Sequence, residues 1–426
     1  MDILLINAPV KKISKHARST PPLGLAYIAS VLIRAGYRVS AIDFNVSGFD
    51  SLRLKRILKR GSPKILGISA HTETYLNGLR IAEIAKQVNP EIKVVMGGPH
   101  PTVMYEEVVR EKDVDVVVRG EGEYTMLELA NSIIGKEKDL AEIKGIAYKE
   151  DGVVKVNPER PFIEDPDELP YPARGLFPLP LYKSPGTVLV SRGGCPFNCR
   201  FCAVNNIWKG RRRYREPEKV LEEIIFILEH EQAQEITFAD DTFTLDRGRV
   251  TELCGLLKQS LQLRWTCSTR VDLVDKELLK EMHEAGCYNI QYGIEAGSQK
   301  ILDSIGKKIT LEQVRDAVST TLDAGTEVTC SFMFPHPEDT QETIREQIQL
   351  MKELGDMEAT LLMSFTTPFP GTYYCEHADE LGIKTMADNW DEYDAKHLMI
   401  ATKHLSKEKL EHLLEELVND VGMVQS

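Results

Sequence analysis

The sequence predicts an α/β protein, in which a doubly wound, Rossmann-like parallel sheet is followed by a partial (β/α)6 barrel of the TIM type and a small helical C-terminal cap. Two observations predict this fold class. Short β-branched runs alternate with amphipathic helical segments over the first 140 residues, and the alternation resumes with longer segments from residue 187. Such alternation is typical of parallel strands whose connecting helices cover the sheet.

The first 140 residues contain apolar runs separated by segments whose apolar residues recur with a period near 3.6. The runs predict strands over residues 2–6, 38–42, 65–68, 93–96 and 114–118, and the intervening segments predict helices over residues 23–36, 51–60, 75–88 and 103–111. Ligands of doubly wound sheets bind at the carboxyl ends of the strands. A binding site is therefore expected among the segments near these ends, residues 7–9, 21–24, 69–75, 97–102 and 119–123.

The rest of the chain predicts a hairpin, a linker and a barrel. Residues 145–156 predict a β-hairpin that turns at Asp151 and Gly152, and the Pro- and Asp-rich residues 161–183 predict an ordered linker. Strands are predicted over residues 187–191, 235–239, 264–269, 288–294, 327–333 and 360–366, and helices over residues 217–232, 245–262, 275–286, 311–325, 342–354 and 407–421. The expected domains are residues 1–140, a linker over 141–186, a barrel over 187–375 and a cap over 376–426.

Composition narrows the function classes. The formal net charge of −13 argues against binding to a nucleic-acid backbone as the main task. No apolar run reaches the length of a membrane span, and the first residues resemble a strand more than a signal peptide. Eight cysteines in 426 residues, three of them clustered, favour a reducing cytoplasm over a disulfide framework.

The clustered cysteines, Cys195, Cys199 and Cys202, have the spacing C-x3-C-x2-C in a loop that follows a predicted strand. Three thiolates on one loop can hold three corners of a [4Fe–4S] cluster and leave the fourth iron open to a small molecule. A structural zinc site would need a fourth ligand, for which the sequence offers no second C-x2-C pair. Buried, inert thiols are the other alternative.

The motif resembles the signature loop of radical S-adenosylmethionine (SAM) enzymes, down to the aromatic residue before the last cysteine. The resemblance implies that SAM chelates the open iron and is cleaved to a 5′-deoxyadenosyl radical. Further matches are the strand edge at residues 240–243, the arginine that faces the SAM carboxylate and the acceptor for the ribose hydroxyls. The implied SAM-binding residues are Phe201, Asp240, Asp241, Arg270, Glu295, Ser298, Tyr214 and Arg215.

Some of these residues have a second interpretation. Residues 240–243 could simply cap a helix. The basic residues 211–213 are expected to form a solvated face. Pro335 stands where the family commonly has a glycine, and His336 could contact substrate or cap a turn.

The chain as a whole resembles the cobalamin-binding members of the radical SAM enzymes, over residues 1 to about 410. The sequence lacks the Asp-x-His-x-x-Gly motif whose histidine ligates cobalt in B12-dependent mutases, so the resemblance implies base-off cobalamin without a histidine ligand. The loop from His71 to Tyr75 is the candidate for the lower side of cobalt. A nucleotide, or an empty structural domain, remains an alternative. The implied cobalamin-binding residues are Pro22, Leu23, Gly24, His71, Thr72, Tyr75, Gly97, Gly98, Pro99, His100, Arg119, Gly120, Glu121 and Glu123.

The resemblance implies a C-methyltransferase, in which the adenosyl radical abstracts hydrogen from an unactivated carbon and methylcobalamin supplies the methyl group. Another radical reaction, such as cyclisation or rearrangement, or a non-catalytic cobalamin or redox sensor, stays open. The implied partner is a low-potential flavodoxin or ferredoxin. The substrate could be a small molecule, a lipid or a protein side chain, for example a glutamine of methyl-coenzyme M reductase.

Overall fold

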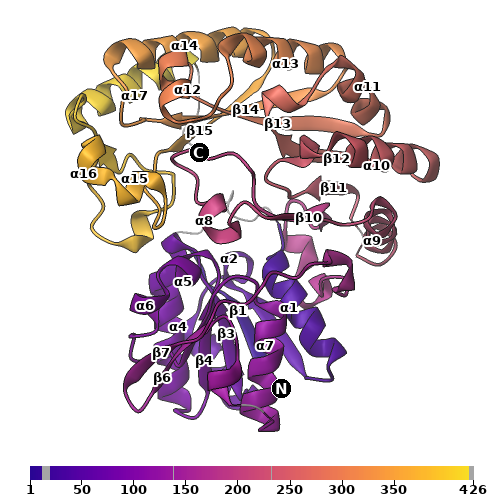
Figure 1. Ribbon diagram of the computed structural model, residues 1–426, viewed down its shortest axis with the longest axis vertical. Helices are drawn as coiled ribbons and strands as arrows, with labels where there is room; N and C mark the ends of the chain where they lie inside the picture. The colour runs from indigo at the N-terminus through magenta and orange to yellow at the C-terminus, as the bar shows by residue number, and fades with distance from the viewer. Residues whose placement is uncertain (12–19, 138, 232, 422–426) are drawn as a thin grey trace. The chain divides into compact units, whose positions relative to one another are not determined.

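The computed structural model describes residues 1–11, 20–137, 139–231 and 233–421. The chain forms two compact units, Met1–Pro185 and Gly186–Ser426 (Figure 1). Each unit has its own sheet and its own hydrophobic core. The two units are therefore described separately.

In the described residues, the first unit contains a seven-stranded sheet with the order β2-β1-β3-β4-β5-β6-β7. The first five strands pair in parallel, and the last two continue the sheet antiparallel. The strands are β1 Ile3–Asn7, β2 Val39–Asp43, β3 Ile65–Ser69, β4 Lys93–Gly97, β5 Val116–Val118, β6 Ile146–Glu150 and β7 Val153–Val156. The predicted parallel sheet and the predicted hairpin are both confirmed.

Helices cover both faces of this sheet, as a doubly wound topology requires. Figure 1 shows α1 and α7 on one side and α4 on the other. The apolar stripe of α1, which includes Leu25 and Leu32, packs with Ile3 and Val95 in one core cluster. The helices are α1 Leu23–Arg34, α2 Phe44–Ser47, α3 Ser51–Gly61, α4 Tyr75–Val88, α5 Pro99–Val103, α6 Tyr105–Val108 and α7 Glu123–Ala130.

One predicted helix is wrong, because residues 103–111 do not form a single helix. The chain instead starts α5 earlier, with Pro99 at the first helical position, where a proline lacks only an amide that would be unpaired anyway. Met104 then interrupts the helix with φ −99° and ψ 27°, and α6 follows it. The helix α7 was not predicted.

The Pro-rich segment that follows the hairpin packs into the first unit. Phe177 and Tyr182 are buried in the same core cluster as the first sheet. The Tyr182 hydroxyl donates a hydrogen bond of 2.9 Å to Oδ2 of Asp43, at the end of β2. The other oxygen, Oδ1, accepts from the Asn7 side chain and the Asn45 amide. Because the carboxylate has partners from three places in the chain, it ties this segment to the sheet.

Over the part of the chain that the structure describes, the second unit contains a six-stranded parallel sheet in the order β15-β14-β13-β12-β11-β8. Each strand pairs with the next one along the chain, and the two end strands do not pair with each other. The strands are β8 Thr187–Val188, β11 Glu235–Phe238, β12 Arg264–Thr269, β13 Cys287–Glu295, β14 Glu327–Phe334 and β15 Thr360–Phe365. This is the predicted partial (β/α)6 barrel.

An outer layer of helices packs on one face of this sheet (Figure 1). The core between them holds Trp265, whose ring meets Phe238 edge-on at 5.2 Å between centroids. The helix α17 near the C-terminus packs against α14. The helices are α8 Val204–Trp208, α9 Pro217–His230, α10 Arg247–Ser260, α11 Lys276–Glu284, α12 Gln299–Ser304, α13 Leu311–Asp323, α14 Gln341–Asp356, α15 Tyr373–Glu376, α16 Ala378–Leu381 and α17 Lys407–Val421.

The predicted strand over residues 187–191 divides into two elements. Only β8 joins the barrel sheet, and Ser191–Gly193 forms a second strand, β9, which pairs antiparallel with β10, Arg212–Tyr214. Two further short strands, β16 Lys384–Thr385 and β17 Ile400–Ala401, pair near the C-terminus. The division at residues 189–190 directs the chain from the barrel into the cysteine loop.

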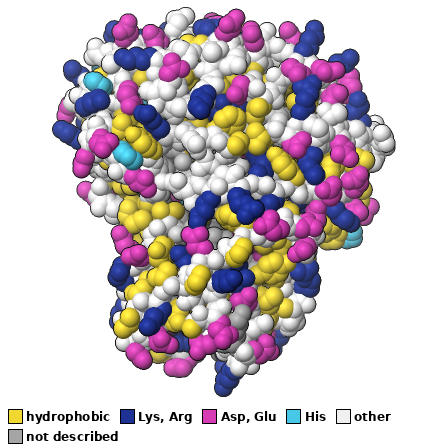
Figure 2. Space-filling model, in the orientation of Figure 1, with side chains coloured by type: hydrophobic (Ala, Val, Ile, Leu, Met, Phe, Trp, Pro, Cys, Tyr) yellow, Lys and Arg dark blue, Asp and Glu magenta, His cyan; other side chains and the backbone are white. Residues whose placement is uncertain are grey.

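The surface carries both signs of charge. Figure 2 shows acidic and basic side chains interspersed over the visible face, consistent with a net charge of −13. Among the described residues, no helix combines the length and the apolar character that crossing a bilayer requires.

Replacing Tyr182 by Phe should loosen the segment around it, because the change removes the hydroxyl that donates to Asp43. A hydrogen bond to a charged group contributes about 1.5–3 kcal/mol, so this segment should open at least about tenfold more often. Hydrogen–deuterium exchange on peptides from residues 170–185 measures the opening. Tyr373→Phe, at a partly exposed tyrosine of the second unit, is the control. Unchanged protection in Tyr182→Phe would contradict the assigned contact.

Candidate functional site

The three cysteines lie on the loop between β9 and α8, and each thiol is half-buried. The loop is fixed by hydrogen bonds at several points. The side chain of Asn205 donates to the carbonyl of Phe197 and to the side chain of Asn198, both at 2.7 Å. The amide of Arg200 donates to the carbonyl of Ile305, after α12. These contacts hold the loop against the barrel without using the thiols.

The start of the loop requires a glycine. Gly193 has φ +123°, and a Cβ there would lie 2.1 Å from the carbonyl oxygen of Arg211, the residue before the paired strand β10. No larger side chain fits this approach. Gly193 is therefore a requirement of the β9–β10 ribbon that carries the loop.

The arrangement of the thiols fits an iron–sulfur cluster better than a single ion. Within the described ranges, no three His, Cys, Asp or Glu side chains converge so that they could hold one metal ion. A cubane cluster has no such requirement, because each thiolate binds a different iron. Burial raises the pKa of the Cys202 thiol to about 11, and it also raises the pKa of Cys199, against the opposing effect of Lys307 and Arg270. Cations beside Cys199 suit a loop that must hold anionic thiolates.

Arg270 stands at the end of β12 and contacts the cysteine loop directly. Its guanidinium lies 3.6 Å from the centroid of the Phe197 ring, in a cation–π contact. It donates to both carboxylate oxygens of Asp272, at 2.8 and 3.0 Å, and to the carbonyl of Lys307 at 2.7 Å. Arg270 is only 4% exposed, so it is a fixed positive group next to the loop.

Glu295 stands at the end of β13, where the register with β14 shifts by a bulge. Its backbone has φ +74°, a conformation that non-glycine residues rarely adopt. Its carboxylate accepts a 3.0 Å hydrogen bond from Nζ of Lys307, which is buried. Sequence reasoning missed Lys307, because a lone lysine in a loop after a short helix has no distinguishing pattern.

His336 is a buried bridge at the end of β14. Its Nε2 lies 3.2 Å from the carbonyl oxygen of Glu295, and its Nδ1 lies 3.2 Å from the hydroxyl of Tyr374. Its ring lies 6.1 Å from the ring of Phe201 between centroids. Both ring nitrogens therefore have protein partners, which favours a positioning role for His336 over a role in contacting substrate.

Asp240 connects the end of β11 to the chain just before the cysteine loop. Its carboxylate accepts from the amides of Val190 and Ser191 at 2.9 and 2.8 Å and from the Ser191 hydroxyl at 2.5 Å. Burial raises the pKa of Asp240 to about 6, although these hydrogen bonds oppose the shift. The carboxylate supports the loop from inside the protein, whereas the next residue, Asp241, is exposed. The hydroxyl of Thr242, which sequence reasoning did not single out, donates to Sγ of Cys195 at 3.5 Å.

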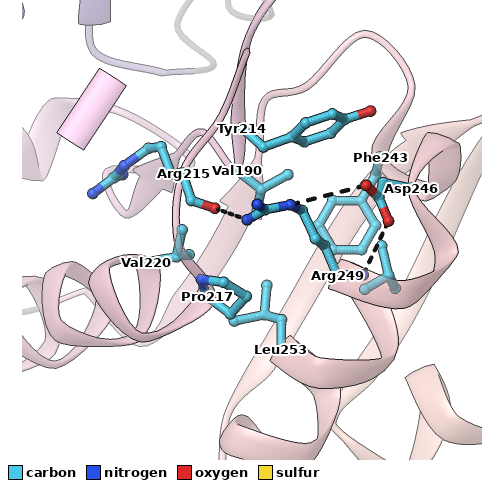
Figure 3. Close-up of a pocket in the computed structure, with 10 residues that line it drawn as sticks. Val190, Tyr214, Arg215, Pro217, Val220, Phe243, Asp246, Arg249 and Leu253 are labelled. Carbon is cyan, nitrogen blue, oxygen red and sulfur yellow. Dashed lines mark hydrogen bonds and ion pairs between the residues drawn. The ribbon is translucent and has the colours of Figure 1, made fainter. Parts of the chain in front are cut away.

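The side chains of Tyr214 and Arg215, at the end of β10, point in different directions (Figure 3). The guanidinium of Arg215 forms a buried ion pair with Glu223 of α9. Its carbonyl accepts from Arg249 at 2.9 Å, and the figure shows its side chain turned away from Tyr214. These residues line a cavity of about 20 Å³, room for about one water molecule. Arg215 thus holds the ribbon to α9, a contact that does not suit a SAM ligand.

The basic run before Tyr214 is not a solvated face throughout. Arg211 is exposed, but Arg213 is buried, with its guanidinium 5.9 Å from the centroid of the Trp208 ring. The guanidinium nitrogen Nη2 of Arg212, between them in the chain, donates to the carbonyl of Thr242. The prediction of solvated arginines is therefore wrong for Arg213, because the β9–β10 ribbon folds it against α8.

Ser298 lies at the start of α12 and is buried without donating or accepting a capping bond there. The preceding Gly297 is needed for packing, since a Cβ would lie 2.3 Å from Cα of Gln347 on α14. The side-chain oxygen of Gln347 accepts from the Gly297 amide at 3.3 Å. The turn at residues 297–298 is therefore pressed against α14.

In the first unit, the predicted cobalamin residues gather at the carboxyl edge of the sheet. The strand order places the topological switch point between β1 and β3, where doubly wound sheets bind their ligands. The loop after β4 touches the loop after β3, because a Cβ on Gly98 would lie 2.8 Å from the carbonyl oxygen of Ala70. Gly98 has φ +103°, so this approach requires glycine. Gly97, Gly98 and Pro99 thus adjoin the loop that starts at His71.

Three of the predicted residues form one small cluster at this edge. The ring of His100 packs against the ring of Tyr75 at 4.4 Å between centroids, with the two planes tilted by 33°. Its Nδ1 lies 3.3 Å from Oγ1 of Thr72. His100 is only 2% exposed, and burial lowers its pKa to about 4, so the ring is neutral at pH 7. The cluster formed by Thr72, Tyr75 and His100 is therefore uncharged at pH 7.

The residues after β5 mainly make contacts with other residues of the first unit. Arg119 donates to the carbonyl of Asn157 at 2.6 Å, and its guanidinium lies over the Tyr105 ring. Glu121 accepts from the amide of Ile163 at 2.7 Å, and Glu123 is buried at the start of α7. Gly120 has φ +74°, and a Cβ at this position would meet nothing within 4 Å. The remaining predicted residues, Pro22, Leu23 and Gly24, begin α1.

Comparisons with known proteins match one segment in each part of the chain to a protein family. Residues 189–351 match the radical SAM superfamily, and residues 13–130 match the B12 binding domain. An uncharacterized methyltransferase of Pyrococcus horikoshii, PH0819, is 37% identical over 98% of this chain and 91% of that protein. The anaerobic magnesium-protoporphyrin IX monomethyl ester cyclase of Rubrivivax gelatinosus is 31% identical over 89% of this chain and 69% of its own. The solved structure of the methyltransferase TsrM from Kitasatospora setae, with cobalamin and a [4Fe–4S] cluster, is similar in fold, with a TM-score of 0.78 at 18% identity, over 99% of this chain and 89% of that one.

Replacing Asp240 by Asn should weaken the support of the cysteine loop. The amide keeps one acceptor but points an N–H₂ group toward backbone donors, which costs about 1–3 kcal/mol for each buried group left unpaired. Urea unfolding followed by tryptophan fluorescence measures the loss, because all three tryptophans lie in the second unit. Asp241→Asn, at the adjacent exposed carboxylate, is the matched control and should unfold like the parent chain. Equal midpoints for the two variants would refute the role of Asp240.

Proposed function

The chain belongs to the radical SAM enzymes that carry a B12-binding domain, and on this basis we propose that it is a cobalamin-dependent C-methyltransferase acting on an unactivated carbon. The observation that carries the proposal is the cysteine loop, in which the Cys199 thiol lies beside two buried cations at the strand ends of a partial barrel. The P. horikoshii relative, which is named a methyltransferase, supports the reaction type.

The residues of the second unit have different proposed roles at the SAM site. A [4Fe–4S] cluster on the three thiols supplies the electron for SAM cleavage, and cobalamin supplies the methyl group. Arg270 and Lys307 lie beside Cys199 and are the proposed partners of the SAM carboxylate, although each already pairs with a carboxylate of the protein, Asp272 or Glu295. Glu295 presents a carboxylate that Lys307 holds, and it is the proposed acceptor for ribose hydroxyls. Phe201, Asp241, Ser298 and Tyr214 remain proposed contacts, whereas Asp240 and Arg215 support the loop and its ribbon.

In the first unit, the proposed cobalamin site is the edge formed by Thr72, Tyr75 and the Gly97–Gly98 turn. We propose base-off cobalamin without a histidine ligand. The support is that the sequence lacks the Asp-x-His-x-x-Gly motif and that His100 is buried against Tyr75. Thr72, Tyr75 and the Gly97–Gly98 turn would hold the cofactor, and the absence of a histidine ligand would be one way to tune its metal centre.

The proposed partner is a low-potential flavodoxin or ferredoxin, and the proposed location is the cytoplasm, where thiols stay reduced. A protein or peptide side chain, such as the glutamine of methyl-coenzyme M reductase, is one proposed substrate. Cyclisation is the second candidate reaction, because the R. gelatinosus cyclase is 31% identical over most of both chains.

The test is to incubate anaerobically reconstituted full-length protein with SAM that carries a deuterated methyl group and with cell extract. We expect about four irons per chain, SAM cleavage, and a product heavier by the labelled methyl group in mass spectrometry. Cys199→Ala should lose the cluster and SAM cleavage, whereas Cys375→Ala, at an exposed cysteine outside the loop, should keep both. SAM cleavage by Cys199→Ala would refute the cluster assignment, and a dehydrated or cyclised product without label would favour the cyclase reaction.

The axial environment of cobalt can be tested by absorbance. The protein loaded with cobalamin should give the spectrum of the base-off form, because no histidine is proposed to reach the metal. His100→Gln should give the same spectrum as the parent chain, since the His100 ring is buried and packs against Tyr75. A base-on or histidine-ligated spectrum, or a spectral change in His100→Gln, would contradict the proposal.

A further inference from the structure

The two faces of the second sheet differ sharply in chemistry. Residues that alternate toward the helices are buried and mostly apolar, as in Ile290, Tyr292 and Ile294 of β13. Residues near the middle of four neighbouring strands that alternate toward the other face, here called the inner face, are half-buried and polar, whereas Met333, near the end of β14, is apolar. The inner-face residues are Thr237 of β11, Thr266 and Ser268 of β12, Asn289 and Gln291 of β13, and Thr329 and Ser331 of β14.

Strand register aligns these side chains in rows. Thr237 pairs with Thr266, which pairs with Asn289. In the next row, Ser268 pairs with Gln291, which pairs with Thr329. Because parallel neighbours in register share a face, the rows form a continuous polar surface.

The inner face is partly satisfied by its own hydrogen bonds. The Asn289 side chain donates to Oγ1 of Thr329 at 3.1 Å, and Gln291 donates to Oγ of Ser331 at 2.8 Å. In contrast, Oγ1 of Thr237 is buried and has no hydrogen-bond partner among the described residues. The face therefore keeps hydrogen-bonding capacity that the protein itself does not use.

This composition is unusual for a barrel interior, which bulky branched apolar residues normally fill. A buried polar group without a partner costs about 1–3 kcal/mol. An apolar guest such as a lipid chain would offer no hydrogen bond to these groups and would leave Oγ1 of Thr237 unpaired. Although the other row continues from Asn289 to the exposed Glu327 of β14, the row from Ser268 to Thr329 carries no charged side chain. Neutral hydrogen-bonding groups are its natural complement.

We propose that the substrate presents neutral amide or hydroxyl groups to this inner face, with Gln291 as a specificity-determining residue. The inference rests on the proposed methyltransferase function and adds the chemical class of the substrate. Gln291 lies at the centre of the face, and its side chain offers both a donor and an acceptor. The same reasoning disfavours a lipid chain.

The test follows a deuterated methyl group from SAM into extract of the source organism that is first separated into protein, aqueous small molecules and a chloroform-soluble phase. Label in the protein or in the aqueous phase supports the inference and identifies which of the two supplies the amide or hydroxyl groups. Label in the chloroform phase overturns it. No label in any phase overturns the proposed methyl transfer, and this inference with it.

The variant Gln291→Leu then tests the residue. Leucine has a similar size but no hydrogen-bonding groups, so the KM for the labelled substrate should rise about tenfold or more. Met333→Leu, an apolar exchange on the same side of β14, is the control. Iron content and the Kd for SAM, measured by equilibrium dialysis, report whether the SAM site is intact. An unchanged KM overturns the role of Gln291, and so does a parallel tenfold loss of SAM affinity, which would assign the face to SAM.

Discussion

In the second unit, one buried carboxylate at the end of β11 determines where the chain leaves the barrel sheet after β8. The carboxylate of Asp240 accepts hydrogen bonds from the amides of Val190 and Ser191. These amides would otherwise continue the strand pairing of the barrel sheet beyond β8. The chain must then leave the sheet, and it pairs with β10 as a separate ribbon. The cysteine loop follows directly from that ribbon. A side chain at the end of β11 thus determines where the thiols of a loop about forty residues earlier are presented.

Charge near the loop comes from elements that are distant in sequence. Arg270 ends β12 and Lys307 follows α12, and both lower the cost of ionising Cys199. Arg270 also donates to the carbonyl of Lys307, and Lys307 donates to Glu295. The three residues therefore form one hydrogen-bonded chain across two strand ends. Burial makes each of these charges effective, since buried pairs are screened less than exposed ones.

The sequence was sufficient to predict both sheets and the position of the thiols, because period and spacing are local properties. Contacts that depend on tertiary structure were harder to predict. From the sequence, Asp240 was expected to bind SAM or to cap a helix. Only the folded structure shows that its carboxylate accepts hydrogen bonds from Val190 and Ser191. Arg213 looked solvated as part of a basic run, but the ribbon places it over Trp208. Lys307 gave no local signal, because its partner Glu295 belongs to a strand that precedes a separate helix.

Because residues 161–183 pack onto the first sheet, they limit where the chain can be cut into fragments. A fragment that stopped near residue 140 would leave β5 as a bare edge, with Val116, Val117 and Val118 lacking the neighbours that β6 provides. Open strand edges of this kind invite pairing between copies. The compact unit continues to Pro185, so a soluble cobalamin-binding fragment has to carry the hairpin and the Pro-rich segment as part of its own fold.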